Sequence, residues 1–263
     1  MTRIDCRQIS VDDLAESAQI RLAHDAVVKD GYVVMDHVVP EQKIAALNAE
    51  FRARYHNYLQ DSELADTLKI GHRRSMTPLD LSGGFADCLI YANPYVSAVA
   101  KLALGWDAVL ESFGAVVALA GAQQQHIHRD GPLLFDTIIS PILPAYALTL
   151  AMPLIDMNDS HGTTALWPAS HRWRERNEEV PPIAPDVPAG SCILWDFRLF
   201  HGGTENRSEQ HRPMIYSTYS RRWYQDPTNF HKKALPRLSL TQDFLESVPA
   251  DRRSLFYHLL KTG

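Results

Sequence analysis

Six short β-rich runs in the second half of the chain limit the folds that it can adopt. They follow Gly105 and are separated by clusters of Gly, Pro, Asn, Asp and Ser, residues that favour turns. The runs are Leu110 to Ala120, Gln124 to Arg129, Ala147 to Ile155, Thr163 to Trp167, Ser191 to Trp195 and Met214 to Tyr219. Several short strands with irregular turns are typical of a sandwich or barrel. We therefore expect a mainly β protein whose β core covers about residues 106–225.

Helical patterns precede this β region. We predict a helix over residues 11–29, with Asp12 or Asp13 as its N-cap, and a short strand from Gly31 to Met35. A second helix is predicted after Pro40, where apolar residues recur at spacings of three and four. Those apolar residues are Ile44, Leu47, Phe51 and Tyr55.

The remaining segments outside the β region divide simply. The polar, Gly-containing residues 70–84 are predicted to form a loop, and residues 95–104 a further helix. Residues 241–260 are predicted as one helix that Thr241 caps. No internal repeat or linker divides the chain, so we expect one domain over residues 1–263, with a helical part at about 1–105 and a C-terminal helix at about 241–261.

Charge and cysteine content exclude several classes of protein. The chain has 26 Lys and Arg against 31 Asp and Glu, a net charge of −5, which gives no general attraction to nucleic acid. The acidic N-terminus does not resemble a signal peptide, and no apolar run is long enough to cross a membrane. Cys6, Cys88 and Cys192 are too far apart for a thiolate zinc site. We expect a cytoplasmic protein that binds a small molecule; a homodimer stays open.

Three segments carry the residues with chemical potential. The first contains Gln125, His126, His128 and Asp130, and alternation along a strand would place the two histidines and the carboxylate on one face. The second places His201 before two glycines, where backbone can approach another group closely. The third brings Arg212, eleven residues after His201, to the start of the next β run.

A His-x-Asp pair with one distant histidine is the pattern of the facial triad of non-haem Fe(II) oxygenases. Two neutral imidazoles and one carboxylate hold iron on one side and leave three positions open. His128, Asp130 and His201 match this pattern, and Arg212 offers a planar fork to a carboxylate. His126 is the rival ligand; we prefer a position at the pocket mouth because no acid follows it two residues later.

The chain resembles the phytanoyl-CoA dioxygenase family, Fe(II)- and 2-oxoglutarate-dependent enzymes built on a double-stranded β-helix. The resemblance covers roughly residues 31–229. Within the family, the chain is most similar to the branch that tailors natural products. It lies in His128-Arg129-Asp130, the segment from Asp159 to Arg172, and His201-Gly202-Gly203 with Asn206 and Arg212. It implies a jelly-roll, cupin-like core with Fe(II), 2-oxoglutarate and O2 as cofactor and co-substrates.

The resemblance also implies a role for each matched residue. His128, Asp130 and His201 would ligate iron, Arg212 would pair with the distal carboxylate of 2-oxoglutarate, and Gln125 and Thr164 would be secondary contacts. Two turns depart from the usual family pattern. They are Ser160-His161-Gly162 and Pro168-Ala169-Ser170-His171. Because Asp130 is present, the chain does not resemble the halogenases of this superfamily, which lack this carboxylate.

Two further expectations concern the surroundings of the site. The segment from Pro132 to Tyr146 is apolar and interrupted by prolines, and it either packs in the core or forms a lid over the iron. Its apolar character favours an apolar or aromatic substrate. Asp196 and Arg198 are expected to form a turn salt bridge that braces His201. The expected function is oxidation of a small metabolite in secondary metabolism; the alternative is a cupin-like protein that binds a small molecule without catalysis.

Overall fold

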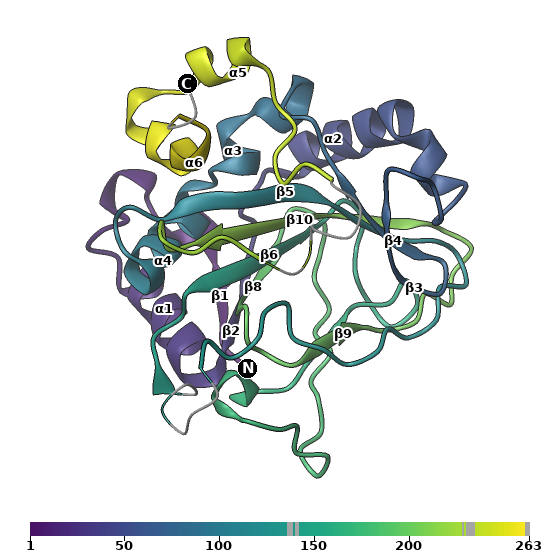
Figure 1. Ribbon diagram of the computed structural model, residues 1–263, viewed down its shortest axis with the longest axis horizontal. Helices are drawn as coiled ribbons and strands as arrows, with labels where there is room; N and C mark the ends of the chain where they lie inside the picture. The colour runs from purple at the N-terminus through teal and green to yellow at the C-terminus, as the bar shows by residue number, and fades with distance from the viewer. Residues whose placement is uncertain (136–138, 140–141, 228, 230–234, 261–263) are drawn as a thin grey trace.

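A large, mostly antiparallel sheet forms the centre of the molecule (Figure 1). The computed structural model describes residues 1–135, 139, 142–227, 229 and 235–260. In this part of the chain an eight-stranded sheet has the order β1-β2-β8-β6-β10-β5-β4-β3, and β7 pairs with β9 in a second sheet of two strands. Among the named strands of the described residues, β1 and β2 are the one pair that runs parallel. The expected mainly β architecture with flanking helices is confirmed.

The bounds of the elements are as follows. The strands are β1 Arg3–Asp5, β2 Tyr32–Asp36, β3 Leu68–Gly71, β4 Arg74–Pro78, β5 Val109–Ala118, β6 Ala147–Pro153, β7 Thr164–Leu166, β8 Cys192–Asp196, β9 His201–Gly203 and β10 Arg212–Ser220. The α-helices are α1 Ala18–Asp30, α2 Glu41–Arg54, α3 Cys88–Tyr91, α4 Pro94–Leu104, α5 Gln242–Ser247 and α6 Tyr257–Leu260. The longest 3-10 segments are η3 His56–Leu59, η4 Gly83–Ala86 and η7 Ala250–Phe256.

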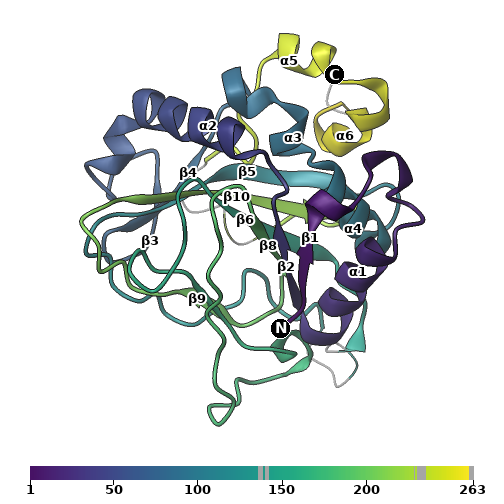
Figure 2. The same ribbon diagram turned by 180° about the vertical axis from the view of Figure 1, so that it is seen from behind.

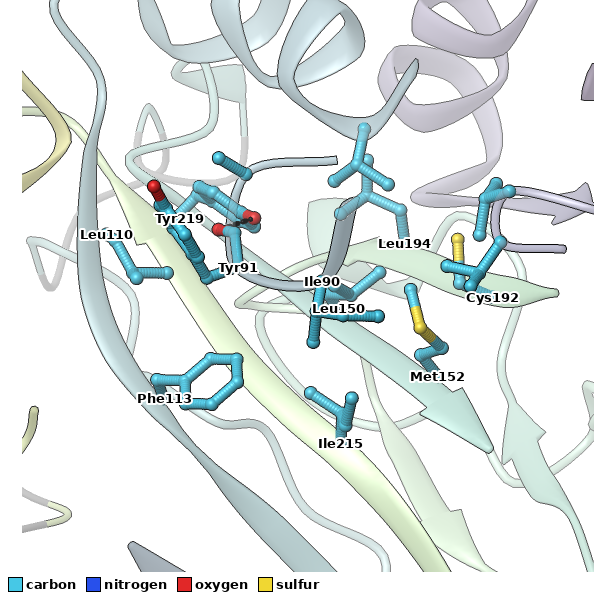
Figure 3. Close-up of a cluster of buried hydrophobic side chains, with 14 of the residues drawn as sticks. Ile90, Tyr91, Leu110, Phe113, Leu150, Met152, Cys192, Leu194, Ile215 and Tyr219 are labelled. Carbon is cyan, nitrogen blue, oxygen red and sulfur yellow. Dashed lines mark hydrogen bonds between the residues drawn. The ribbon is translucent and has the colours of Figure 1, made fainter. Parts of the chain in front are cut away.

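The two faces of the large sheet have different neighbours. The helices α2, α3, α5 and α6 lie over one face, and β9 lies on the other side of the sheet (Figures 1 and 2). On β10, Ile215 and Tyr219 belong to the apolar cluster under the helices, whereas Met214 and Tyr216 belong to the cluster on the opposite face. Figure 3 shows Ile215 and Tyr219 beside Phe113 and Leu150 on the helix-covered side. Alternation along the strand therefore reserves one face for the core and one for a site.

The N-terminal helix begins later than expected. Ser17, not Asp12 or Asp13, caps α1, and its hydroxyl accepts a hydrogen bond from the amide of Ile20 at 3.3 Å. Asp12 and Asp13 belong to a separate 3-10 turn over Val11–Asp13. Gly31 ends the helix in the left-handed conformation, with φ at 85°, which is the usual position for glycine. The helices after Pro40 and at residues 95–104 were predicted correctly as α2 and α4.

The predicted loop over residues 70–84 is wrong in its first part, because β3 and β4 form a hairpin there. All five residues of β4 pair with β5, which buries Arg74, Ser75 and Thr77. Polar strand residues give no apolar alternation, so only the tertiary contacts reveal this strand.

The predicted strand from Gln124 to Arg129 is also wrong. This segment is irregular in the structure and makes one isolated bridge, between His128 and His201. The face-sharing argument for His126, His128 and Asp130 therefore does not apply, and their arrangement has another origin.

The predicted continuous C-terminal helix is broken into α5, η7 and α6, although Thr241 caps α5 as expected. Pro249 disfavours a helical conformation at Val248, whose ψ is 125°. Residue 261 lies outside the described residues. No helix of the described residues has the length and apolar character that crossing a membrane requires.

Candidate active site

His128 and His201 are joined through their main chains. The amide of His128 donates to the carbonyl of His201 at 3.0 Å, and the amide of His201 donates back to His128 at 2.9 Å. Their rings lie with centroids 4.4 Å apart. This bridge ties the irregular segment after β5 to β9, so two histidines that are far apart in sequence present their side chains side by side.

Each imidazole is also held through one ring nitrogen. Nδ1 of His128 lies 2.9 Å from the carbonyl oxygen of His126, and Nδ1 of His201 lies 3.0 Å from that of Leu199. A carbonyl only accepts hydrogen bonds, so Nδ1 carries the proton and Nε2 keeps its lone pair. Burial, with the neighbouring His201, lowers the pKa of His128 to about 4. His128 is therefore neutral near pH 7, as a metal ligand requires.

Asp130 completes the group. Its Oδ1 lies 3.6 Å from Nε2 of His201 and 4.0 Å from Nε2 of His128. Tyr216 donates to Oδ1 at 2.8 Å, while Thr149 and the Trp195 indole donate to Oδ2 at 2.6 and 3.1 Å. Three donors from the sheet thus orient the carboxylate towards the two histidines.

The structure brings together the three side chains that the sequence predicts as metal ligands, and we refer to them as the metal-binding group. Their potential ligand atoms all lie within 4.8 Å of one another, and within the described residues no second group of three such side chains comes as close together. His126 is not part of it, although its ring centroid lies 4.9 Å from that of His128. Its carbonyl anchors His128, and its exposed side chain lines the mouth of the cavity.

Arg212 is completely buried at the start of β10. Its Nη1 donates to the carbonyl of Thr163 at 3.3 Å, but Nε and Nη2 have no hydrogen-bond partner. Burial, together with Arg74, lowers the pKa of Arg212 to about 9. A buried guanidinium with two unused donors is costly unless an anion pairs with it.

Arg74 is the functional candidate that the sequence analysis missed. The strand register places Arg74 and Arg212 on either side of Ala118, so both project from the same face of the sheet. Arg74 donates to the carbonyls of Gln123 and Thr204, while its Nε and Nη1 have no partner. Because Arg74 lies in a segment that was predicted as a loop, the sequence pattern contained no signal for it.

Gln125, Thr164 and Gly203 lie between the arginines and the metal-binding group. Gln125 accepts a hydrogen bond from the amide of Gly203 at 3.1 Å, and Thr164 is buried with an unpartnered hydroxyl. A Cβ atom on Gly203 would lie 2.4 Å from Nη1 of Arg74. A side chain at position 203 would therefore displace the guanidinium of Arg74.

A cavity of about 350 Å³ opens beside the metal-binding group, and neither Arg74 nor Arg212 is among its lining residues. Its lining includes His128, Asp130, His201, Gln125 and Thr164, together with apolar residues from β3, β4 and β10. A larger groove of about 560 Å³ lies between α4 and η7 and contains none of the metal-binding side chains. The smaller cavity is therefore the one that contains the three candidate metal ligands.

Comparison with known proteins identifies the family. Residues 27–214 match the family model described as Phytanoyl-CoA dioxygenase (PhyH). The chain belongs to this family. The resemblance seen in the sequence is thereby confirmed.

Two curated relatives are fungal dioxygenases. The chain is 30% identical over 165 residues to the dioxygenase af480 of Aspergillus fumigatus, covering 60% of this chain and 51% of af480. It is 23% identical over 195 residues to the Fe(II)/2-oxoglutarate-dependent dioxygenase nvfF of Aspergillus novofumigatus, covering 70% of this chain and 65% of nvfF. The matches thus span about half to two thirds of these relatives' lengths.

A solved structure supports the fold. The epimerase SnoN, in complex with Fe3+, alpha ketoglutarate and nogalamycin RO, aligns with a TM-score of 0.60 at 16% identity, covering 86% of this chain and 97% of SnoN. The phytanoyl-CoA dioxygenase family member described here therefore has the double-stranded β-helix fold.

In this family member, Arg129, the residue between His128 and Asp130, holds the neighbouring turn in place. The Arg129 guanidinium donates to the carbonyl of Arg198 at 2.9 Å and to that of Trp173, and it lies 4.0 Å from the ring centroid of Phe200. The expected pair of Asp196 and Arg198 is present and buried, with a distance of 2.7 Å. These contacts fix the turn that leads into His201.

His161 and His171 do not reach the metal-binding group. His161 lies near the Asp156 carbonyl, and His171 packs beside Gly31 with its Nε2 near the Val28 carbonyl. The segment over residues 132–146, expected to be either core packing or a lid, lies partly outside the described residues, at 136–138 and 140–141. Its described end packs inward, because Tyr146 is buried and donates to the Pro132 carbonyl at 2.7 Å.

Proposed function

We propose that this chain is a non-haem Fe(II)- and 2-oxoglutarate-dependent oxygenase that oxidises a small molecule. One observation carries the proposal: two buried arginines with unused donors lie on the same sheet face as Tyr216, which contacts the metal-binding carboxylate. A protein that only binds a metal has no need of an anion site at this place.

The side chains that are present fit an iron ion. His128 and His201 would hold it through Nε2, because both Nδ1 atoms lie by main-chain carbonyls. Asp130 would contribute Oδ1, which accepts one hydrogen bond and lies nearest the two Nε2 atoms, whereas Oδ2 accepts two. Three protein ligands on one side leave room for a chelating co-substrate. Bound Fe(II) with 2-oxoglutarate and O2 supplies the oxidation of an unactivated C–H bond.

The side chains also fit 2-oxoglutarate. We assign its distal carboxylate to Arg212 and Arg74, whose planar donor groups suit a carboxylate. The unpartnered hydroxyl of Thr164 and the amide of Gln125 are the secondary contacts. An anion in this position would satisfy donors that are otherwise buried without partners.

The substrate is proposed to be a small apolar or aromatic metabolite of secondary metabolism. The nogalamycin RO bound to SnoN, an epimerase from nogalamycin biosynthesis, supports a small metabolite, and the apolar side chains that line the cavity favour an apolar body. The outcome of the oxidation, whether hydroxylation, epimerisation, desaturation or cyclisation, depends on how the substrate is held. Residues 1–263 are proposed to act as one domain; a cytoplasmic location and a homodimer stay predictions.

Anaerobic loading tests this function directly. Protein with Fe(II) and 2-oxoglutarate should develop a weak visible charge-transfer band, and on exposure to air should convert 2-oxoglutarate slowly to succinate. Bound iron without a band or turnover would instead support the alternative, a cupin-like protein that binds a small molecule without catalysis.

A further inference from the structure

The register of the large sheet divides the site face into rows of side chains. Arg74 and Arg212 lie in one row, on either side of β5. Tyr216, which contacts the metal-binding carboxylate, lies four residues further along β10. The next row beyond it contains Ser112 and Thr218. Since every second residue of a strand points to the same face, one more row lies between the arginines and Tyr216.

This intermediate row is entirely apolar. It crosses four strands, and each of its members pairs with the next through the strand register. All of its members line the cavity beside the metal-binding group. They are Leu68 on β3, Met76 on β4, Val116 on β5 and Met214 on β10. We refer to these four side chains as the apolar row.

The apolar row leads away from the metal-binding group. The three side chains that donate to the Asp130 carboxylate come from β6, β8 and β10. In the strand order β8-β6-β10-β5-β4-β3, the cavity continues from there over β5, β4 and β3. Neighbouring strands are about 4.8 Å apart, so three spacings make the apolar row about 14 Å long from Met214 to Leu68. The cavity is therefore elongated towards the β3 edge of the sheet.

The two halves of the apolar row differ in burial. Val116 and Met214 are buried, whereas Leu68 and Met76 are only half-buried, as is Ile70 on β3. The half-buried side chains line the cavity, so part of their apolar surface is left uncovered within it. Removing such surface from water is favourable, which makes this half of the row suited to an apolar part of a ligand.

The edge strand β3 is in contact with the segment that carries the metal ligands. A Cβ atom on Gly71, the last residue of β3, would lie 3.9 Å from Cγ of Gln125. The side chain of Gln125 accepts a hydrogen bond from the amide of Gly203, two residues after His201. In the described part of the chain β3 pairs with β4 alone, so Leu68 stands at the far end of the apolar row.

The co-substrate assigned above does not cover this far end. Its distal carboxylate is assigned to Arg74 and Arg212, which flank Ala118 on β5. Leu68 lies two strands and one row away from Ala118, a separation of about 12 Å. A co-substrate that extends from the metal-binding group to the two arginines therefore leaves Leu68 accessible to a second molecule.

We propose that Leu68 and Met76 determine which substrates fit, by binding the apolar end of an elongated substrate whose reacting carbon lies at the iron. The inference rests on the proposed function and refines its substrate class. The apolar body of the substrate extends along the row, from Met214 towards the β3 edge. Leu68, at the end of the row, sets the length of the body that the site accepts.

Two fluorinated aromatic fragments of different length test this assignment. The protein is loaded with Mn(II) and 2-oxoglutarate, and Mg(II)-loaded protein is the diamagnetic blank. The affinities of 4-fluorotoluene and 2-fluoronaphthalene are taken from the change of their ¹⁹F paramagnetic relaxation with protein concentration. We expect the two-ring fragment to bind about three-fold more tightly or better, because it covers more of the apolar row. Equal affinities, or tighter binding of the toluene, would overturn the proposal.

A bulky substitution locates the end of the site. Leu68→Trp should weaken binding of 2-fluoronaphthalene about five-fold or more, and that of 4-fluorotoluene less than about two-fold, because the added bulk shortens the site. Leu102→Trp is the matched control. Leu102 is also a half-exposed leucine, but it lines the larger groove between α4 and η7. It should change neither affinity.

Three outcomes contradict the role of Leu68. They are an unchanged or tighter binding of the naphthalene in Leu68→Trp, an equal loss for both fragments, and the same loss in Leu102→Trp. If Leu68→Trp does not fold, Leu68→Asp replaces it, since this variant adds charge to the wall without bulk. It should weaken binding of the naphthalene about three-fold or more, and an unchanged affinity would count against the proposal.

Metal and co-substrate binding are measured first, by the Mn(II) EPR signal and its change with 2-oxoglutarate. A protein that retains neither contradicts the proposed function, and the role of Leu68 then loses its basis. A protein that binds both, but whose preference for the longer fragment does not respond to Leu68, contradicts this inference alone.

Discussion

His128 and His201 exchange two main-chain hydrogen bonds, at 3.0 and 2.9 Å, although they are 73 residues apart. The geometry of the metal-binding group therefore depends on a backbone bridge as well as on side chains. Each ring is then oriented by a carbonyl two residues earlier, at His126 and Leu199. Such supporting contacts decide the position of a ligand as much as its identity does.

Replacing His201 with Ala should abolish iron retention, whereas His126→Ala should not. The side chain of His201 contributes Nε2 to the group, but His126 contributes only its main-chain carbonyl, which the alanine variant keeps. Iron per protein after gel filtration, measured by atomic absorption, checks both. Equal losses in the two variants would mean that His126 is a ligand.

Replacing Arg212 with Ala should weaken 2-oxoglutarate binding about 10- to 100-fold, in line with the loss of charged hydrogen bonds, and should change iron binding much less. Arg74→Ala should act in the same direction, since Arg74 flanks the same residue, Ala118, on the other side. Calorimetric titration with 2-oxoglutarate measures the effect.

Arg207→Ala is the control for this pair, because Arg207 is exposed and contacts Asp159 and Glu205 at the surface. Unchanged co-substrate affinity in Arg212→Ala would contradict the assigned role. An unchanged affinity in Arg74→Ala alone would limit the site to one arginine.

Replacing Tyr216 with Phe should lower metal affinity about 10-fold, because the variant removes one of three donors to Asp130. Burial and the neighbouring Asp130 raise the pKa of Tyr216 well above its usual value, so the hydroxyl stays a donor. Competition with a chelating dye measures the affinity. Tyr219→Phe, on the opposite face, should leave it unchanged, since its hydroxyl bonds to Tyr91.

Replacing Gly31 with Ala should destabilise the protein by about 1–2 kcal/mol or more. Its φ of 85° is unfavourable for any residue with a Cβ atom, and that atom would lie 2.5 Å from Leu199 and 2.6 Å from His171. Gly71→Ala is the matched control, because its nearest neighbour would be 3.6 Å away. Urea unfolding compares the two; similar midpoints would show that the helix end tolerates a side chain.

Much of the fold followed from local patterns in the sequence. Gly31 and Pro40 marked helix boundaries, and apolar runs predicted β5, β6, β8 and β10. The errors share one cause. The strand β4 is polar, and the segment before Asp130 is irregular. The helix break at Val248 depends on one proline. Each of these segments departs from the periodic pattern of apolar residues on which a prediction from sequence depends.

The sequence by itself indicated the proposed chemistry of this protein, because His128, Asp130, His201 and Arg212 have the residue types and spacing that this chemistry requires. Only the tertiary structure decided which ring nitrogens of His128 and His201 are held by main-chain carbonyls. It also decided that Arg74 lies in one row with Arg212 and Ser112 in one row with Thr218. The physical reason is strand pairing. Residues from separate strands become neighbours through the register of main-chain hydrogen bonds, and no local sequence pattern specifies that register.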